Sequence, residues 1–109
     1  MKLTLIMKLT VALLFALLLT TITAHAASDA ARGKELRVEC IDCHGEDGMG
    51  DDEYPKIAGL DEAYLFDQLM AFKTGKRPNR AEMMSWAIED LEEQDLADLA
   101  AYYALQKGN

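Results

Sequence analysis

Two cysteines and a histidine stand in the spacing Cys40-Ile41-Asp42-Cys43-His44. This C-x-x-C-H pattern is the attachment sequence of a covalently bound c-type haem. Two thiols three positions apart share a turn of helix, where each can add to one of the two vinyl groups of the haem. The next residue, His44, then lies under the iron as its proximal ligand. These residues therefore predict iron redox chemistry on a cofactor that cannot dissociate.

The same cysteines allow a second interpretation, a thiol redox protein without haem. Such proteins place C-x-x-C near a strand–helix–strand unit. The chain shows helical patterns without strand alternation, and His44 directly follows the second cysteine, so the haem interpretation is favoured. With only 2 cysteines in the chain, a structural disulfide elsewhere is excluded.

The N-terminal segment has the three parts of a secretory signal peptide. Lys2 and Lys8 precede the apolar run 9–19, and the segment ends in Ala24-His25-Ala26, a small-x-small cleavage site. The apolar core is shorter than the roughly 20 residues of a membrane span; an uncleaved anchor is the alternative. We expect cleavage of residues 1–26 and export to the periplasm, the compartment where c-type haem is attached.

The remaining part, residues 27–109, is long enough for one domain with a modest core. A covalently attached haem would supply the additional stabilisation that so short a chain needs. Loss of Lys2 and Lys8 leaves 9 basic against 19 acidic residues, a net charge of −10. This charge disfavours nucleic acid, and it favours redox partners with a basic docking patch. No membrane span is expected after cleavage.

Helical patterns recur along this domain, which predicts an all-α fold. A first helix, capped by Ser28 or Asp29, should reach about Cys40, and its Gly33 would let a second helix cross closely. Residues 45–60 contain four glycines and a proline and should form an irregular loop over one haem edge.

The second half of the domain should contain two longer helices. Asp61 caps the first, over 62–73, and Gly75 stops it; a short helix or ordered loop follows over 82–90. The last helix starts near residue 92 and ends before Gly108. The side chains expected inside are Tyr64, Leu65, Leu69, Phe72, Leu96, Leu99, Ala100 and Tyr103. The residues expected to solvate the outer side of the last helix are Gln94 and Asp98.

The residues alone leave the second ligand of the iron open. After cleavage His44 is the only histidine, so a second histidine ligand from the same chain is excluded. Met49 is too near His44 to cross to the other haem face, and Met70 is expected in the core. Met83, Met84, an open position or a lysine remain. A methionine thioether is a soft ligand that favours ferrous iron.

With these residues in hand, the domain resembles class I cytochrome c. The likeness is to the short bacterial monohaem type and the single modules of dihaem periplasmic cytochromes c, and it covers nearly all of residues 30–106. It is carried by Gly33, Cys40-x-x-Cys43-His44-Gly45, Tyr54-Pro55-Lys56-Ile57-Ala58-Gly59, Tyr64-Leu65-x-x-Gln68-Leu69, Met83-Met84 and Leu91-x-x-x-Asp95-Leu96-Ala97-Asp98-Leu99-Ala100-Ala101-Tyr102-Tyr103. The resemblance implies a small all-α fold wrapped around one covalent haem c.

The resemblance also implies the haem ligands. Cys40 and Cys43 would form the thioethers, and His44 would be the proximal ligand. In this family the axial methionine lies seven residues before the leucine that opens the last helical segment. Counting back from Leu91 gives Met84 as the second ligand.

Two further positions follow from the family pattern. The carbonyl of Pro55 would accept a hydrogen bond from the ring N–H of His44, orient that ring and tune its basicity. The first and last helices would cross, which fits Gly33 against Tyr102 or Tyr103.

For several charged or aromatic side chains, the sequence allows more than one role. Trp86 either packs on the haem, bonds a propionate through its indole N–H, or lies exposed at a docking face. Candidate propionate partners on charge alone are Arg77, Arg80 and Lys56, with a surface role as the alternative. The five acidic residues between Glu46 and Glu53 could form part of a docking rim.

The function that the resemblance implies is periplasmic electron transfer by a His/Met-ligated haem, without enzymatic activity. The alternative is a haem c subunit that accepts electrons in a periplasmic dehydrogenase complex, such as flavocytochrome c sulfide dehydrogenase. A haem sensor or peroxidase-like protein would instead require an open or labile sixth position on the iron.

Overall fold

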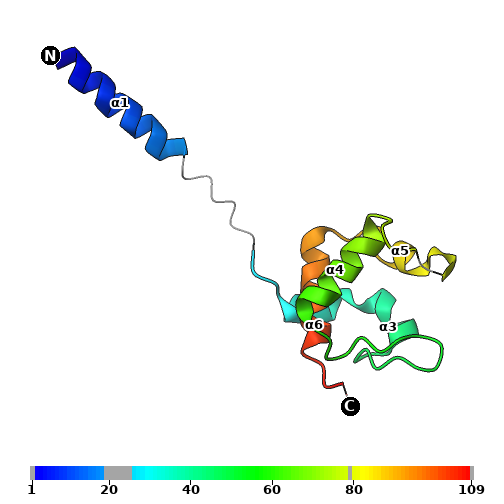
Figure 1. Cartoon of the computed structure of the whole chain (residues 1–109). Helices are drawn as coiled ribbons and strands as arrows, with labels where there is room; N and C mark the ends of the chain where they lie inside the picture. The colour runs from blue at the N-terminus through cyan, green and yellow to red at the C-terminus, as the bar shows by residue number, and fades with distance from the viewer. Residues whose placement is uncertain (1, 19–25, 79, 109) are drawn as a thin grey trace.

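The computed structural model describes residues 2–18, 26–78 and 80–108, and every regular element in these ranges is helical (Figure 1). The elements are α1 (Lys2–Leu18), α2 (Ala30–Leu36), α3 (Val38–His44), α4 (Glu62–Lys73), the 3₁₀ turn η1 (Arg80–Glu82), α5 (Met83–Ala87) and α6 (Glu93–Ala104). The prediction of an all-α domain is confirmed. Helices α2 to α6 gather into one body.

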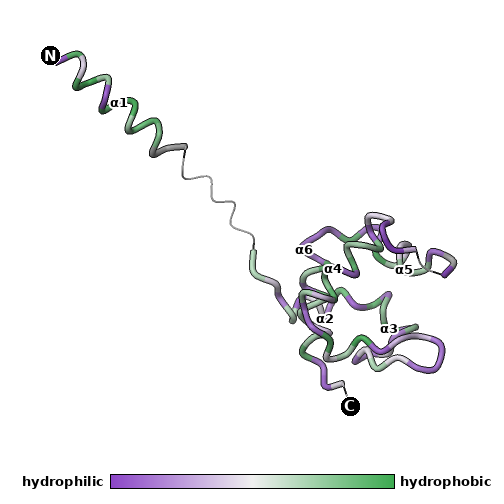
Figure 2. The backbone as a smooth tube through the Cα atoms, viewed as in Figure 1, coloured by the Kyte–Doolittle hydropathy of each residue, from purple (hydrophilic) through white to green (hydrophobic). Residues whose placement is uncertain are grey.

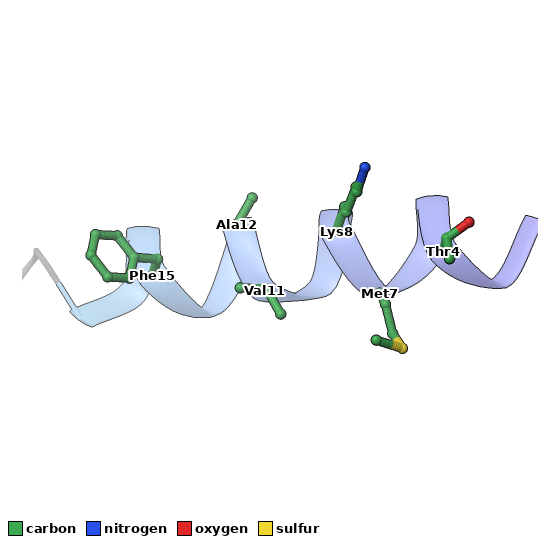
Figure 3. Close-up of a pocket in the computed structure, with 6 residues that line it drawn as sticks. All are labelled: Thr4, Met7, Lys8, Val11, Ala12 and Phe15. Carbon is green, nitrogen blue, oxygen red and sulfur yellow. The ribbon is translucent and has the colours of Figure 1, made fainter.

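Helix α1 contributes no side chain to the core of that body. Figure 2 shows it as mostly hydrophobic with a hydrophilic start, and its large hydrophobic side chains from Leu3 to Phe15 are exposed. The hollow drawn in Figure 3 is lined by Thr4, Met7, Lys8, Val11, Ala12 and Phe15. All six come from this one helix, so the hollow is a helix surface and not an enclosed site. Within the described residues, no helix has the length and apolar character needed to cross a membrane.

The predicted cleavage site involves Ala24 and His25, which lie outside the described residues. Cleavage of residues 1–26, and the assignment of residues 27–109 as the mature domain, therefore remain predictions.

Helix α4 has the bounds that its sequence predicts. A side-chain oxygen of Asp61 accepts the backbone N–H of Tyr64 at 2.9 Å, which is the expected N-cap, and Gly75 follows the helix with a φ of +73°. Tyr64 is 51% exposed, so the prediction that it is buried is wrong. It lies at the margin of the apolar stripe, whose inner members are Leu65, Leu69 and Phe72.

The first expected helix is divided in two, because Arg37 separates α2 from α3 with a φ of −76° and a ψ of 4°. The Arg37 guanidinium donates to the backbone carbonyls of Lys34 and Glu46 and lies 5.3 Å from the ring centroid of Tyr102. These contacts hold the break in place. As a consequence, the C-x-x-C-H motif lies on its own short helix, separate from the helix that packs on α6.

Helices α2 and α6 cross at Gly33, as predicted. A Cβ atom at this position would collide with the backbone carbonyl of Asp98 and lie 2.9 Å from the Cβ of Tyr102. Only glycine therefore permits this approach. The buried core around the crossing consists of Leu65, Phe72, Ile88, Leu96, Leu99, Ala100, Tyr102 and Tyr103.

The prediction that Asp98 faces solvent is wrong, since this residue is 1% exposed. Its carboxylate accepts hydrogen bonds from the N–H of Asp29 at 2.8 Å, from Arg32 at 2.7 Å and from the amide of Gln94 at 2.9 Å. Burial acts to raise the pKa of Asp98, but these three donors outweigh it and hold the pKa below its usual range. A buried carboxylate thus joins the start of α2 to α6. Gln94 is itself half-buried.

Candidate haem site

Helix α3 brings the motif residues together at its C-terminal end. Cys40 and Cys43 are three positions apart and half-buried, and His44, the last residue of the helix, is 7% exposed. Gly45 ends the helix with a φ of +83°, and its N–H donates to the carbonyl of Ile41 at 2.8 Å. Residues three positions apart share a helix face, so both thiols can reach one ligand.

The imidazole of His44 has a defined partner. Its Nδ1 lies 2.8 Å from the carbonyl oxygen of Pro55, and the ring of Tyr54 stands edge-on with the centroids 6.4 Å apart. A carbonyl oxygen only accepts hydrogen bonds, so Nδ1 carries the proton and Nε2 keeps its lone pair. A buried histidine with this arrangement is a donor set that fits haem iron at Nε2.

The loop from residue 45 to residue 60 folds back onto α3. The N–H of Gly50 donates to the backbone carbonyl of His44 at 2.8 Å, and the carbonyl of Gly48 accepts the N–H groups of Ile57 and Ala58 at 2.8 and 2.9 Å. Gly48 and Gly50 have φ angles of +75° and +65°, and a Cβ on Gly48 would lie 2.7 Å from the ring of Tyr103. The prediction of an irregular loop is confirmed; its position over a haem edge remains a prediction.

Sequence reasoning missed the role of Asp51 inside this loop. One of its carboxylate oxygens accepts the backbone N–H groups of Glu53 and Tyr54, both at 2.8 Å, and its own N–H donates to the carbonyl of Tyr54 at 2.9 Å. The bonds from Tyr54 and Glu53 hold the pKa of Asp51 below its usual range. The signal was present, because aspartate shortly before Tyr-Pro is typical of a turn closed by its own side chain.

The environment of Cys40 is unlike that of a reactive thiol. Burial raises the pKa of the Cys40 thiol, whereas redox-active cysteines have a lowered thiol pKa. Tyr103 packs beside Cys40. Among the described residues, the buried hydroxyl of Tyr103 has no hydrogen-bond partner. Burial also raises the pKa of Tyr103. These properties argue against a haem-free thiol redox protein.

The four methionines considered as ligands lie in different surroundings. Met84 is half-buried on α5 and packs against the core, while its neighbour Met83 is 41% exposed. Met70 is also packed against the core, as predicted, and Met49 lies exposed in the loop after α3. Packing thus differs between Met83 and Met84, and which of them binds the iron remains a prediction.

Trp86 and the three basic residues named as candidate propionate partners all lie at the surface. Trp86 is 62% exposed, so it takes no part in the core, and its three alternatives remain open predictions. Arg77 donates to the side-chain oxygen of Gln68 at 2.6 Å and lies 4.5 Å from the ring centroid of Phe72, so it already has protein partners. Arg80 and Lys56 are exposed. A propionate contact for any of the three basic residues remains a prediction.

Comparison with known proteins identifies close relatives. The family model described as cytochrome c matches residues 30–104. Cytochrome c4 of Pseudomonas aeruginosa is 46% identical over 92% of this chain and 49% of its own length. Cytochrome c-554(548) of Halomonas halodenitrificans is 37% identical over 74% of this chain and 100% of its own. The thiosulfate dehydrogenase electron acceptor of Thiomonas intermedia is 43% identical over 77% and 38% of the respective chains.

The fold agrees with this relationship. The crystal structure of cytochrome c4 from Pseudomonas stutzeri superposes with a TM-score of 0.68 at 38% identity, covering 76% of this chain and 48% of that one. This chain spans about half the length of the cytochrome c4 relatives that it matches. Cytochrome c domains carry haem c bound through C-x-x-C-H, and the paired cysteines of α3 fit that cofactor. The chain belongs to the cytochrome c family.

Proposed function

We propose that this protein is a periplasmic electron carrier with one covalent haem c. Cys40 and Cys43 form the thioether links, and His44 and Met84 bind the iron on its two sides. The haem, when bound, supplies one-electron chemistry by cycling its iron between the ferric and ferrous states. The chain attaches the cofactor, fills both axial positions and thereby excludes substrates from the metal, which makes it a carrier and not an enzyme.

The geometry of His44 is the observation that carries this proposal. The carbonyl of Pro55 accepts the proton of Nδ1, so Nε2 is available to iron, and the ring stays buried at the end of α3. A hydrogen bond to the distal nitrogen of a ligating histidine fixes the ring orientation and raises its basicity. The hydrogen bond from Nδ1–H to the Pro55 carbonyl therefore favours the ferric state, and the loop that positions this carbonyl controls how strongly.

The packing of α5 supports Met84 as the second ligand. The Ser85 hydroxyl donates to the carbonyl of Phe72 at 3.2 Å, and the Lys73 ammonium donates to the carbonyl of Glu89 at 3.0 Å. These bonds attach α5 and the segment after it to α4, and Met84, the residue before Ser85, packs against the core. A ligand needs a side chain held at a constant position, which the exposed Met83 lacks.

The predicted leader and the charge of the domain support the proposed location and partners. A segment with the pattern of a secretory signal takes the chain to the compartment of haem attachment. The exposed acidic residues of the loop, from Glu46 to Glu53, would speed encounter with a partner that presents a basic patch.

Matched methionine variants test the ligand assignment in the haem-loaded protein. We expect Met84→Ala to lose the weak far-red band of methionine sulfur on ferric iron, and to bind carbon monoxide rapidly in the ferrous state. Met83→Ala, a neighbouring substitution of the same size, should keep the wild-type spectrum and resist carbon monoxide. Loss of the band in the Met83 variant alone would transfer the assignment to Met83.

Two observations favour a second function: the name of one relative and the exposure of one aromatic side chain. The Thiomonas intermedia protein is named as an electron acceptor of a thiosulfate dehydrogenase, and Trp86 exposes a large aromatic surface on α5 beside Met84. This chain would then be the electron-accepting haem c subunit of a periplasmic dehydrogenase complex. Size-exclusion chromatography after native purification separates the two functions: a carrier elutes at the mass of its own chain, and a subunit elutes with its catalytic partner.

A further inference from the structure

Residues 50–55 form a small loop whose two ends both contact His44. At one end the N–H of Gly50 donates to the backbone carbonyl of His44 at 2.8 Å. At the other end the carbonyl of Pro55 lies 2.8 Å from Nδ1 of the same residue. The loop therefore starts on the backbone of the proposed proximal ligand and returns to its ring.

Asp51 closes this loop from within. Its N–H donates to the carbonyl of Tyr54, and its carboxylate accepts the N–H of Tyr54 and that of Glu53. Both backbone polar groups of Tyr54 are thus bound to Asp51, and Tyr54 directly precedes Pro55. The bonds to Asp51 fix the peptide plane between Tyr54 and Pro55, and because the proline ring restricts φ, they also restrict where the Pro55 carbonyl lies.

Backbone bonds also hold the chain on either side of this loop, and inside it the ring of Tyr54 stands edge-on to that of His44. The carbonyl of Gly48 binds the N–H groups of Ile57 and Ala58, which anchors the segment after Pro55. Inside the loop, the carboxylate of Asp51 accepts two backbone N–H groups. Asp51 is exposed and lies outside the core, so its removal should loosen the loop without unfolding the domain.

We propose that Asp51 is a positioning residue for His44, which acts by holding the Pro55 carbonyl against Nδ1–H. This inference rests on the proposed function, in which His44 binds the iron. A weaker bond at Nδ1 makes the imidazole a poorer electron donor and stabilises ferric iron less, so the reduction potential should rise.

Four variants of the haem-loaded protein separate this role from charge. Asp51→Ala removes the acceptor and the charge, Asp51→Asn removes the charge but keeps an acceptor oxygen, and Asp51→Glu keeps the charge but displaces the carboxylate. Asp52→Ala is the matched control, because this exposed neighbour makes no side-chain hydrogen bond in the part of the chain that the structure describes.

The first readout is the exchange rate of the His44 Nδ1 proton in the ferrous protein, followed by NMR. We expect exchange about fivefold faster in Asp51→Ala and Asp51→Glu, the factor that corresponds to about one hydrogen bond. The Asp51→Asn and Asp52→Ala proteins should exchange at the wild-type rate. If Asp51→Ala fails to incorporate haem, Asp51→Glu gives the same comparison.

The second readout is the reduction potential. Asp51→Asn and Asp52→Ala each remove one negative charge and should raise the potential by similar amounts, whereas Asp51→Ala should raise it further. Equal potentials in these three variants, with unchanged proton exchange in Asp51→Ala and Asp51→Glu, would overturn the positioning role and leave the proposed function standing. A wild-type protein without covalent haem, or without His44 on the iron, would instead contradict the proposed function and this inference together.

Discussion

Two regions of the domain differ in how closely their residues pack. One is the crossing of α2 and α6, and the other is the side of the molecule formed by α3 and α5. At the crossing, Gly33 meets the backbone of α6, and Asp98 has three donors around a buried carboxylate. On the other side, Cys40 and Cys43 are half-buried, and Met83 and Trp86 are exposed. The second region contains the proposed haem-binding residues, whereas the first contains none of them.

This difference indicates a division of labour in a small domain. The crossing is held by contacts that the chain makes with itself, so it can form a scaffold for the remaining helices. The side formed by α3 and α5 carries the residues proposed to attach and bind the haem, so its stability should depend more strongly on the cofactor. Changes made separately in each region test this division. We expect the loss of haem attachment to have the largest effect.

Preventing haem attachment should separate the two regions most clearly. In a Cys40→Ala, Cys43→Ala double variant, we expect the unfolding midpoint to fall far below that of the haem-loaded protein, because the core of so short a chain rarely supplies more than about 3–5 kcal/mol. Residual amide protection in hydrogen exchange should concentrate in α2 and α6. Equal protection in α3 and the loop after it would show that the haem side folds independently of the cofactor.

Enlarging Gly33 should break the crossing itself. A valine side chain would collide with the backbone of Asp98, which cannot move without shifting α6, so we expect Gly33→Val to cost about 3 kcal/mol or more. Ala31→Val, on the exposed face of the same helix, is the control for the lower helix propensity of valine. Denaturant unfolding of the haem-loaded proteins measures both. Similar losses in the two variants would argue that no close contact exists at Gly33.

Removing the buried carboxylate should have a smaller and pH-dependent effect. We expect Asp98→Ala to cost about 2 kcal/mol at pH 7, less than a fully buried ion pair because Arg32 is half exposed. The folded pKa of Asp98 is lowered, so its stabilisation is fully present above the unfolded pKa of about 4 and is lost as the pH falls through the folded pKa. The difference in unfolding free energy from wild type should therefore shrink in acid.

Asp67→Ala on α4 is a suitable reference for that measurement, since Asp67 is exposed and makes no side-chain hydrogen bond in the described ranges. Its unfolding free energy should stay within about 0.5 kcal/mol of wild type. A loss in Asp98→Ala that persists unchanged in acid would mean that the charge of Asp98 is not what stabilises the crossing.

Local signals predicted the parts of the fold that depend on neighbouring residues. Asp61 and Gly75 mark the two ends of α4, and the structure places that helix between them. Gly33 indicated a close crossing, because a glycine inside a helix is otherwise unfavourable. The break at Arg37 had no such signal, since no glycine or proline interrupts the pattern there, and its cause is a set of contacts with Glu46 and Tyr102.

For the candidate site and its surroundings, the sequence likewise predicted the motif residues but not the contacts that depend on the folded backbone. Cys40, Cys43 and His44 follow from spacing alone, because thioether formation dictates that spacing. The burial of Asp98 did not follow from local pattern: an aspartate on a helix usually faces water, and its donors Asp29 and Arg32 lie more than 60 residues away in the chain. The closure of the loop by Asp51 likewise depends on backbone directions that composition does not reveal.

The visible spectrum of the exported, haem-loaded protein in both redox states is the most direct test of the account. We expect a low-spin c-type spectrum with covalent haem, and in the oxidised form the weak far-red band of methionine sulfur on iron. That result supports ligation by His44 and Met84 and electron transfer at a closed iron. A high-spin spectrum without the band would contradict the closed carrier and favour a sensor or catalytic haem.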